Sequence, residues 1–154
     1  MLFVLLALTT AFLESPIAAF AFRRRESFLY VLVVSALVNL LTNLLLNGVC
    51  LPLLSSTQPG GIWDGWFVLL LGELVLAYAG EGVLYRVLVR ELTLGRSMLV
   101  SALGNTASLG LGLGLWALLG GSGKDLTAGI AVLCGIAGAG WLVCLARGLI
   151  HEKR

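Results

Sequence analysis

Charged residues are scarce in this chain. They make up 12% of its 154 residues, about half the share found in soluble domains. Hydrophobic residues make up 59%, and the mean hydropathy is +1.02. A chain of this composition has too few polar side chains to cover a globular surface, which excludes a soluble fold. The composition predicts an integral membrane protein, and the length is typical of a single domain.

Histidine and cysteine are also scarce. The single histidine, His151, lies in the basic tail, so histidine-based zinc sites and Ser–His catalysis are excluded. The three cysteines, Cys50, Cys134 and Cys144, lack metal-ligand spacing and are expected to act as small packing residues. We therefore predict no cofactor, no metal and no catalytic residue. Any enzymatic chemistry would have to rest on glutamates alone.

Five apolar stretches are long enough to cross a bilayer as helices. They cover about residues 2–22, 28–49, 66–89, 97–119 and 126–149. We predict an all-α fold in a single transmembrane domain over residues 1–154. A Pro-, Ser- and Gly-rich loop, residues 50–64, is the longest connection, and a short basic one, residues 90–96, precedes the fourth span.

Two local features refine this picture. Pro16 removes a backbone donor inside the first span and is expected to kink it, while Ser15 can satisfy a freed carbonyl. Trp63 and Trp66 stand at the start of the third span, where interfacial aromatic residues are common.

The placement of the basic residues predicts an orientation. Nine of the ten lie in three clusters that follow the first, third and fifth spans. Without interleaved aromatic residues they indicate membrane-orienting charges, so the expected partner is the lipid bilayer and not nucleic acid. The expected location is a bacterial plasma membrane, with the N-terminus outside and the C-terminus in the cytoplasm. The clusters are Arg23, Arg24 and Arg25; Arg86, Arg90 and Arg96; and Arg147, Lys153 and Arg154.

This orientation gives a first testable prediction. A cysteine introduced at Thr57 and one at Lys153 should react with a membrane-impermeant thiol reagent from opposite sides of the membrane. The measurement is labelling of intact cells against labelling of permeabilised cells. Labelling of both positions from the same side would contradict the five-span arrangement.

The second and fourth spans share a sequence pattern. Both contain Ser-Ala-Leu-x-Asn-x-x-hydroxyl, at residues 35–42 and 101–108, and Glu14 and Glu81 each lie nine residues before an arginine. The chain therefore resembles a duplicated helical hairpin: repeat one covers about residues 2–49 and repeat two about 66–119, with an additional helix at 126–149. Because both copies run from outside to inside and back, this would be a parallel repeat about an axis normal to the membrane.

Polar side chains at bilayer depth mark a candidate site, because they are costly there and normally face protein or water. Tyr78, Glu81 and Tyr85, at i, i+3 and i+7, are predicted to share one helix face. Helical rise places Glu14 and Glu81 each roughly 13 Å from their arginines, and the two span asparagines at a comparable depth. We expect these groups to converge on one layer. The candidate pathway residues are Glu14, Asn39, Thr42, Asn43, Glu73, Tyr78, Glu81, Tyr85, Ser101, Asn105 and Ser108.

Three functions fit these features. The first is a small transport protein for a proton, a cation or a small polar solute, because carboxyl groups at this depth must be protonated or bind a cation. The second is an accessory or scaffold subunit in a homo-oligomer or a larger membrane complex. The third is a glutamate-dependent intramembrane enzyme. Alternatively, the polar side chains only hold neighbouring helices together by hydrogen bonds.

Two rows of small residues are predicted to lie in close helix contacts, because small side chains let backbones approach. One row is Gly104, Ser108 and Gly112. The other is Ala131, Gly135 and Ala139.

Overall fold

The computed structural model describes residues 2–50, 72–89, 92–119 and 123–152. Within these ranges the chain is all-helical, and four helices are long and apolar enough to span a membrane. The elements are α1 (Leu2–Phe22), α2 (Phe28–Leu45), the π-helix η1 (Leu46–Cys50), the π-helix η2 (Glu73–Gly80), α5 (Glu81–Leu88), α6 (Leu94–Leu118) and α7 (Gly123–Glu152).

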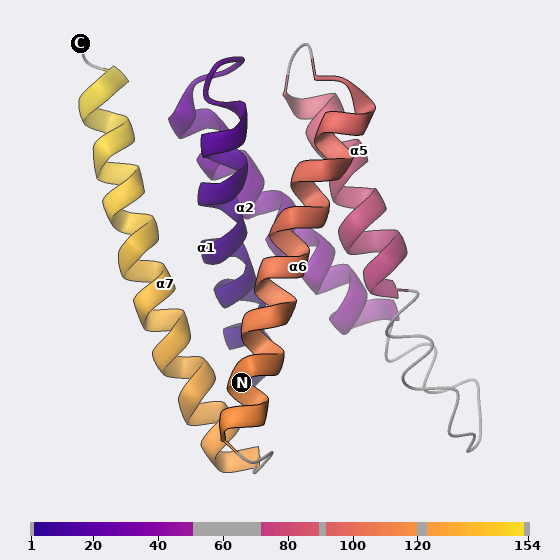
Figure 1. Cartoon of the computed structure of the whole chain (residues 1–154), viewed down its shortest axis with the longest axis vertical. Helices are drawn as coiled ribbons and strands as arrows, with labels where there is room; N and C mark the ends of the chain where they lie inside the picture. Colours follow the sequence, from indigo (N-terminus) through magenta and orange to yellow (C-terminus); the bar gives the residue numbers. More distant parts are fainter. Residues whose placement is uncertain (1, 51–71, 90–91, 120–122, 153–154) are drawn as a thin grey trace.

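Helix α1 is central: α2, α6 and α7 all contact it, and α5 packs against α6 and α2 (Figure 1). The α1–α2 turn and the C-terminal end of α7 lie at one end of the bundle, and the start of α1 lies toward the other. The turn is short because Ser27 caps α2 at once, its side chain accepting a hydrogen bond from the Tyr30 amide.

Pro16 lies inside α1, which remains one helix from Leu2 to Phe22. The Ser15 hydroxyl donates to the carbonyl of Ala11 at 2.6 Å, and not, as expected, to the carbonyl of Phe12 that Pro16 leaves without its α-helical donor. The same hydroxyl accepts a hydrogen bond from the Trp141 indole N–H at 2.9 Å. Ser15 therefore serves the backbone of α1 and also ties α1 to α7.

The third predicted span differs from the expected α-helix. Its described part begins with the π-helix η2 and becomes α-helical only at Glu81. The wider i→i+5 turn changes the direction in which side chains leave the helix, and π-helical turns often occur at functional sites. The expected interfacial residues Trp63 and Trp66 and the loop 50–64 lie outside the described residues, apart from Cys50, the last residue of η1.

Helix α6 begins three residues earlier than predicted, at Leu94. The reason is Thr93, whose extended backbone and side-chain hydroxyl cap the helix by accepting from the Arg96 amide. Arg96 therefore belongs to the first turn of α6 and not to the connection.

A compact apolar core lies beside the α1–α2 turn. Phe22 and Tyr85 pack edge to face, with ring centroids 5.9 Å apart, and both are nearly inaccessible. The Tyr30 hydroxyl donates to the Leu88 carbonyl at 2.9 Å and links α2 to the end of α5. This core fixes the ends of α1, α2, α5 and α6. Its buried members are Ala18, Ala19, Phe22, Val31, Leu32, Val38, Tyr85, Val89, Leu92 and Val100.

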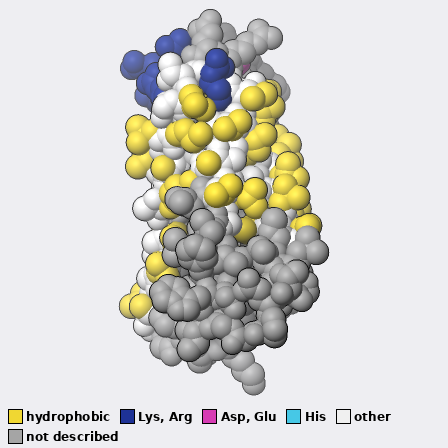
Figure 2. All heavy atoms as spheres, turned by 90° about the vertical axis from the view of Figure 1, so that its right-hand side faces the viewer, with side chains coloured by type: hydrophobic (Ala, Val, Ile, Leu, Met, Phe, Trp, Pro, Cys, Tyr) yellow, Lys and Arg dark blue, Asp and Glu magenta, His cyan; other side chains and the backbone are white. Residues whose placement is uncertain are grey.

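Figure 2 shows arginine side chains gathered at one end of the molecule, above a belt of exposed hydrophobic side chains. We call this the basic end. An exposed apolar belt is expected where helices face lipid, since lipid tails are as apolar as leucine. The arginines whose side chains the structure describes are Arg23, Arg24, Arg25, Arg86, Arg96 and Arg147.

The predicted small-residue rows are only partly correct. Gly104 lies against α1, but a side chain at Gly112 would meet nothing within 4 Å. The row on α7 is wrong: Ala131, Gly135 and Ala139 are exposed. Helix α7 packs through a neighbouring face that includes Cys134, Ala137, Gly138 and Trp141.

This corrected face of α7 predicts the effect of two matched substitutions. Gly138→Leu should lower the free energy of unfolding by about 1–3 kcal/mol, because a Cβ there already lies 3.4 Å from the Phe12 ring. Gly135→Leu makes the same chemical change where nothing lies within 4 Å and should not destabilise the protein. The measurement is thermal or denaturant unfolding in detergent. If Gly135→Leu lowered the free energy of unfolding more than Gly138→Leu, the contact face of α7 would be the predicted row that contains Gly135.

Candidate functional site

The carboxyl group of Glu81 is held between two helices. It is fully buried at the start of α5. Its Oε1 accepts a hydrogen bond from the Thr42 hydroxyl of α2 at 2.7 Å, and its Oε2 accepts one from the Asn105 amide of α6 at 2.9 Å. Both donors are neutral.

Glu14, on α1, is the second buried carboxyl group, with 2% of the residue exposed. Its Oε1 accepts from the Ser108 hydroxyl of α6 at 2.5 Å. Gly104, one turn before Ser108, leaves room for it: a Cβ on this glycine would lie 3.1 Å from Glu14 Oε2. A small residue on α6 thus allows a carboxyl group of α1 to lie against the α6 backbone.

The two carboxyl groups are linked through Asn105. The Ser108 hydroxyl, bonded to Glu14, also lies 3.1 Å from the carbonyl of Asn105, whose amide donates to Glu81. Because a hydroxyl has one proton, Ser108 can donate to only one of these acceptors at a time. The Ser108 hydroxyl can therefore couple the protonation state of Glu14 to Asn105, the residue that donates to Glu81.

On the other side of Glu81 the system continues into α2. The Thr42 hydroxyl lies 3.1 Å from the Asn39 carbonyl, and the Asn39 amide donates to the Tyr85 hydroxyl at 3.1 Å. Tyr85 and Ser35 share a further hydrogen bond of 2.7 Å. Asn39 Oδ1 is buried and has no hydrogen-bond partner among the described residues. We call the whole system the buried polar network: Glu14, Ser35, Asn39, Thr42, Glu81, Tyr85, Asn105 and Ser108.

The two asparagines of the shared sequence pattern make matching bonds. Asn39 donates to the carbonyl of Ser35, and Asn105 to that of Ser101, both four residues earlier and both at 3.0 Å. The remaining N–H of each reaches the third span, at Tyr85 or Glu81. A duplicated hairpin would pair Asn39 with the first span, as Asn105 pairs with the third, so these bonds do not establish the repeat. Superposition of the two hairpins stays a prediction.

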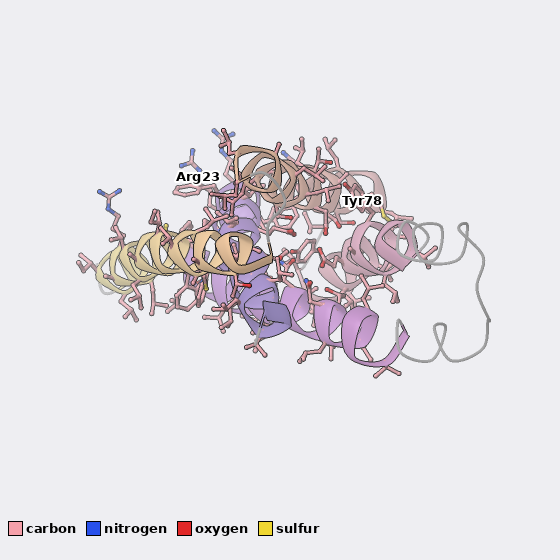
Figure 3. The ribbon with its side chains drawn as sticks, turned by 90° about the horizontal axis from the view of Figure 1, so that it is seen from below. Arg23 and Tyr78 are labelled. Carbon is pink, nitrogen blue, oxygen red and sulfur yellow. The ribbon has the colours of Figure 1, made fainter. Side chains whose placement is uncertain are left out.

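The structure does not bring every predicted site residue into this network. The Tyr78 hydroxyl pairs with Thr106 at 3.1 Å in an exposed setting on α6, and Figure 3 shows this tyrosine beside α6. Tyr78 therefore lies outside the network, whereas Glu81 and Tyr85 belong to it. Tyr78 lies in the π-helix η2, which ends just before Glu81, so the two side chains leave the chain from turns of different width.

Three further predicted residues have other positions. Asn43 is half-buried and donates to the Asn39 carbonyl at 3.0 Å, at the edge of the network. The Ser101 hydroxyl lies 2.9–3.0 Å from the carbonyls of Ala77 and Tyr78, near the junction of η2 and α5. Its one proton can go to either carbonyl, and a pathway role for Ser101 stays a prediction. Glu73 begins η2, and its side chain is outside the described part.

Comparison with known proteins does not assign this chain to a family. No protein-family model, curated protein or solved structure matches this chain. The candidate site therefore has to be interpreted from its own chemistry.

That chemistry consists of carboxyl groups, hydroxyls and amides. Hydroxyls both accept and donate, so Ser108 and Thr42 can exchange a proton with Glu14 and Glu81. The other partners of these two hydroxyls are backbone carbonyls, so passage of the proton beyond them requires water. Carboxylate and amide oxygens are also ligands for hard cations. Within the described residues no group of three or more His, Cys, Asp or Glu side chains could hold a metal ion.

Two residues of this region were missed as site residues. Ser35 lies in the same pattern position as Ser101, so the repeat carried a signal for it. Trp141, which bonds Ser15 beside Glu14, had no such signal, because a tryptophan inside an apolar span usually indicates packing alone.

Proposed function

We propose that this protein is a small membrane transport protein that moves a proton, a cation or a small polar solute through its helical bundle. Glu14 and Glu81 would be the groups that take up and release charge, with Asn39, Thr42, Asn105 and Ser108 controlling their states. The observation that supports this most is that both buried carboxyl groups accept from hydroxyls, with Ser108 and Asn105 of α6 between them. Helix packing alone rarely requires ionisable side chains at this depth.

Of the three cargoes, the proton fits the geometry best. Glu14 and Glu81 are 2% and 0% exposed, and neutral hydroxyl and amide groups already contact their oxygens. A hydrated solute would need the helices to separate, whereas a proton needs only exchange with a neighbouring hydroxyl and a brief contact with water. The orientation with the basic end in the cytoplasm belongs to the same proposal.

The test is a flux assay with the purified protein in liposomes. With a pH gradient imposed and valinomycin and K⁺ present to clamp the membrane potential, a trapped pH-sensitive dye should show faster collapse of the gradient than in protein-free vesicles. If the gradient is unaffected, tracer uptake of Na⁺ and K⁺ tests the cation alternative. Rates equal to those of empty vesicles in all three assays would refute the transport of these ions.

A second candidate, an accessory subunit, is favoured by the exposed small-residue row Ala131, Gly135 and Ala139 on α7. Such a row permits close approach of another helix. In this case a partner or a second copy should co-purify with the wild-type protein in mild detergent. Gly135→Leu should remove it, without any flux in either variant.

A further inference from the structure

A cavity of about 480 Å³ lies at the basic end, where the α1–α2 turn meets α7. It is separate from the buried polar network, none of whose residues lines it. Arg23 from the α1–α2 turn (labelled in Figure 3) and Arg147 from α7 both line the cavity. Glu26 is its one acidic lining residue, so the charged side chains leave one net positive charge.

The rest of the cavity is mainly apolar. Phe20 and Phe28 line it and pack edge to face, with ring centroids 5.1 Å apart, and Cys144 contributes from α7. Phe20 is 54% exposed, on the surface that would face lipid. Gly148 brings α7 close to α2, because a Cβ there would lie 3.3 Å from the Phe28 ring. The cavity thus joins a cationic rim to an apolar, outward-facing wall.

We propose that this cavity binds the headgroup of an anionic phospholipid. Guanidinium groups present paired N–H donors that match phosphate oxygens, and Arg23 and Arg147 come from two different elements. The apolar wall of Phe20, Phe28 and Cys144 would hold the glycerol and the first methylenes of the acyl chains. Basic pockets between membrane helices are known to hold anionic headgroups. A soluble phosphate compound would use the rim and leave the aromatic wall unused.

The experiment compares lipids and variants in thermal unfolding of the detergent-solubilised protein. Added phosphatidylglycerol should raise the unfolding temperature at concentrations where phosphatidylcholine and inorganic phosphate do not. Arg147→Gln should weaken the apparent affinity for phosphatidylglycerol by about fivefold, the value of one surface arginine toward an anionic lipid. Arg86→Gln is the matched control, because Arg86 is an exposed arginine of the basic end that does not line the cavity. It should leave the affinity unchanged.

Cys144→Phe supplies an independent variant that keeps both arginines and fills the cavity. It should weaken phosphatidylglycerol binding as Arg147→Gln does. Equal losses for Arg86→Gln and Arg147→Gln would show a diffuse surface charge and overturn the proposal. Equal stabilisation by phosphatidylcholine, or by inorganic phosphate alone, would overturn it as well.

Discussion

Glu81→Gln should reduce the flux of the reconstituted protein to the rate of protein-free vesicles while leaving its fold intact. The substitution keeps the shape of the side chain but removes the group that can take up a proton or bear a charge at neutral pH. If Glu81 only joined helices, the amide would serve equally well. Loss of flux without loss of stability therefore separates transport from packing.

The hydrogen bonds around Glu81 explain why the fold should survive. The amide oxygen of the new glutamine can accept from Asn105, as Glu81 Oε2 does now. Its N–H can donate to the Thr42 hydroxyl, which can then turn its own proton to the Val38 or Asn39 carbonyl, each 3.1 Å away. The oxygen and one N–H of the new glutamine thus keep partners, so little change in unfolding temperature is expected.

The matched control is Glu26→Gln, the same substitution at a glutamate outside the buried polar network. It should retain the wild-type rate in the pH-gradient assay. Full activity of Glu81→Gln would remove Glu81 from the transport mechanism. Equal loss in both variants would indicate a general effect of removing negative charge.

The polar layer could be predicted from sequence because a polar side chain in an apolar span has to face protein or water. Thr42, Glu81 and Asn105 had to face protein, and the shared pattern of the second and fourth spans placed both asparagines at one depth. The structure brings these side chains within hydrogen-bond distance of one another. What spacing could not give was the partner of each group, which depends on how α1, α2, α5 and α6 are rotated against one another.

The contact face of α7 was not predictable for a physical reason. In a membrane the lipid-facing and protein-facing sides of a helix are both apolar. Hydropathy therefore does not show which side contacts the other helices. The spacing of Ala131, Gly135 and Ala139 was as good a signal as that of Cys134, Ala137 and Gly138, and only the second set is in contact.

The side-chain directions of the third span have a different cause. The π-helix η2 has wider turns than an α-helix, so a period of 3.6 residues does not give the side-chain directions of Glu73–Gly80.

Gly104→Leu should both destabilise the protein and abolish flux, because Gly104 is the point where α6 lies against the carboxyl group of α1. A Cβ at this position would lie 3.1 Å from Glu14 Oε2 and 3.4 Å from Glu14 Cβ and Cγ. A whole leucine side chain requires α6 to move away or Glu14 to leave its place, and either change breaks the Ser108–Glu14 hydrogen bond. The expected loss in free energy of unfolding is about 1–3 kcal/mol.

Gly110→Leu, on the same helix, introduces the same side chain where nothing lies within 4 Å, and it should leave both stability and flux near wild type. The deciding variant is the double substitution Gly104→Leu with Glu14→Ala, which removes the side chain that the leucine would strike. Unfolding in detergent should show recovery of most of the lost stability, while the pH-gradient assay should show no recovery of flux. Recovery of flux along with stability would mean that Glu14 only fills space beside Gly104. Recovery of neither would mean that the leucine strikes something other than Glu14.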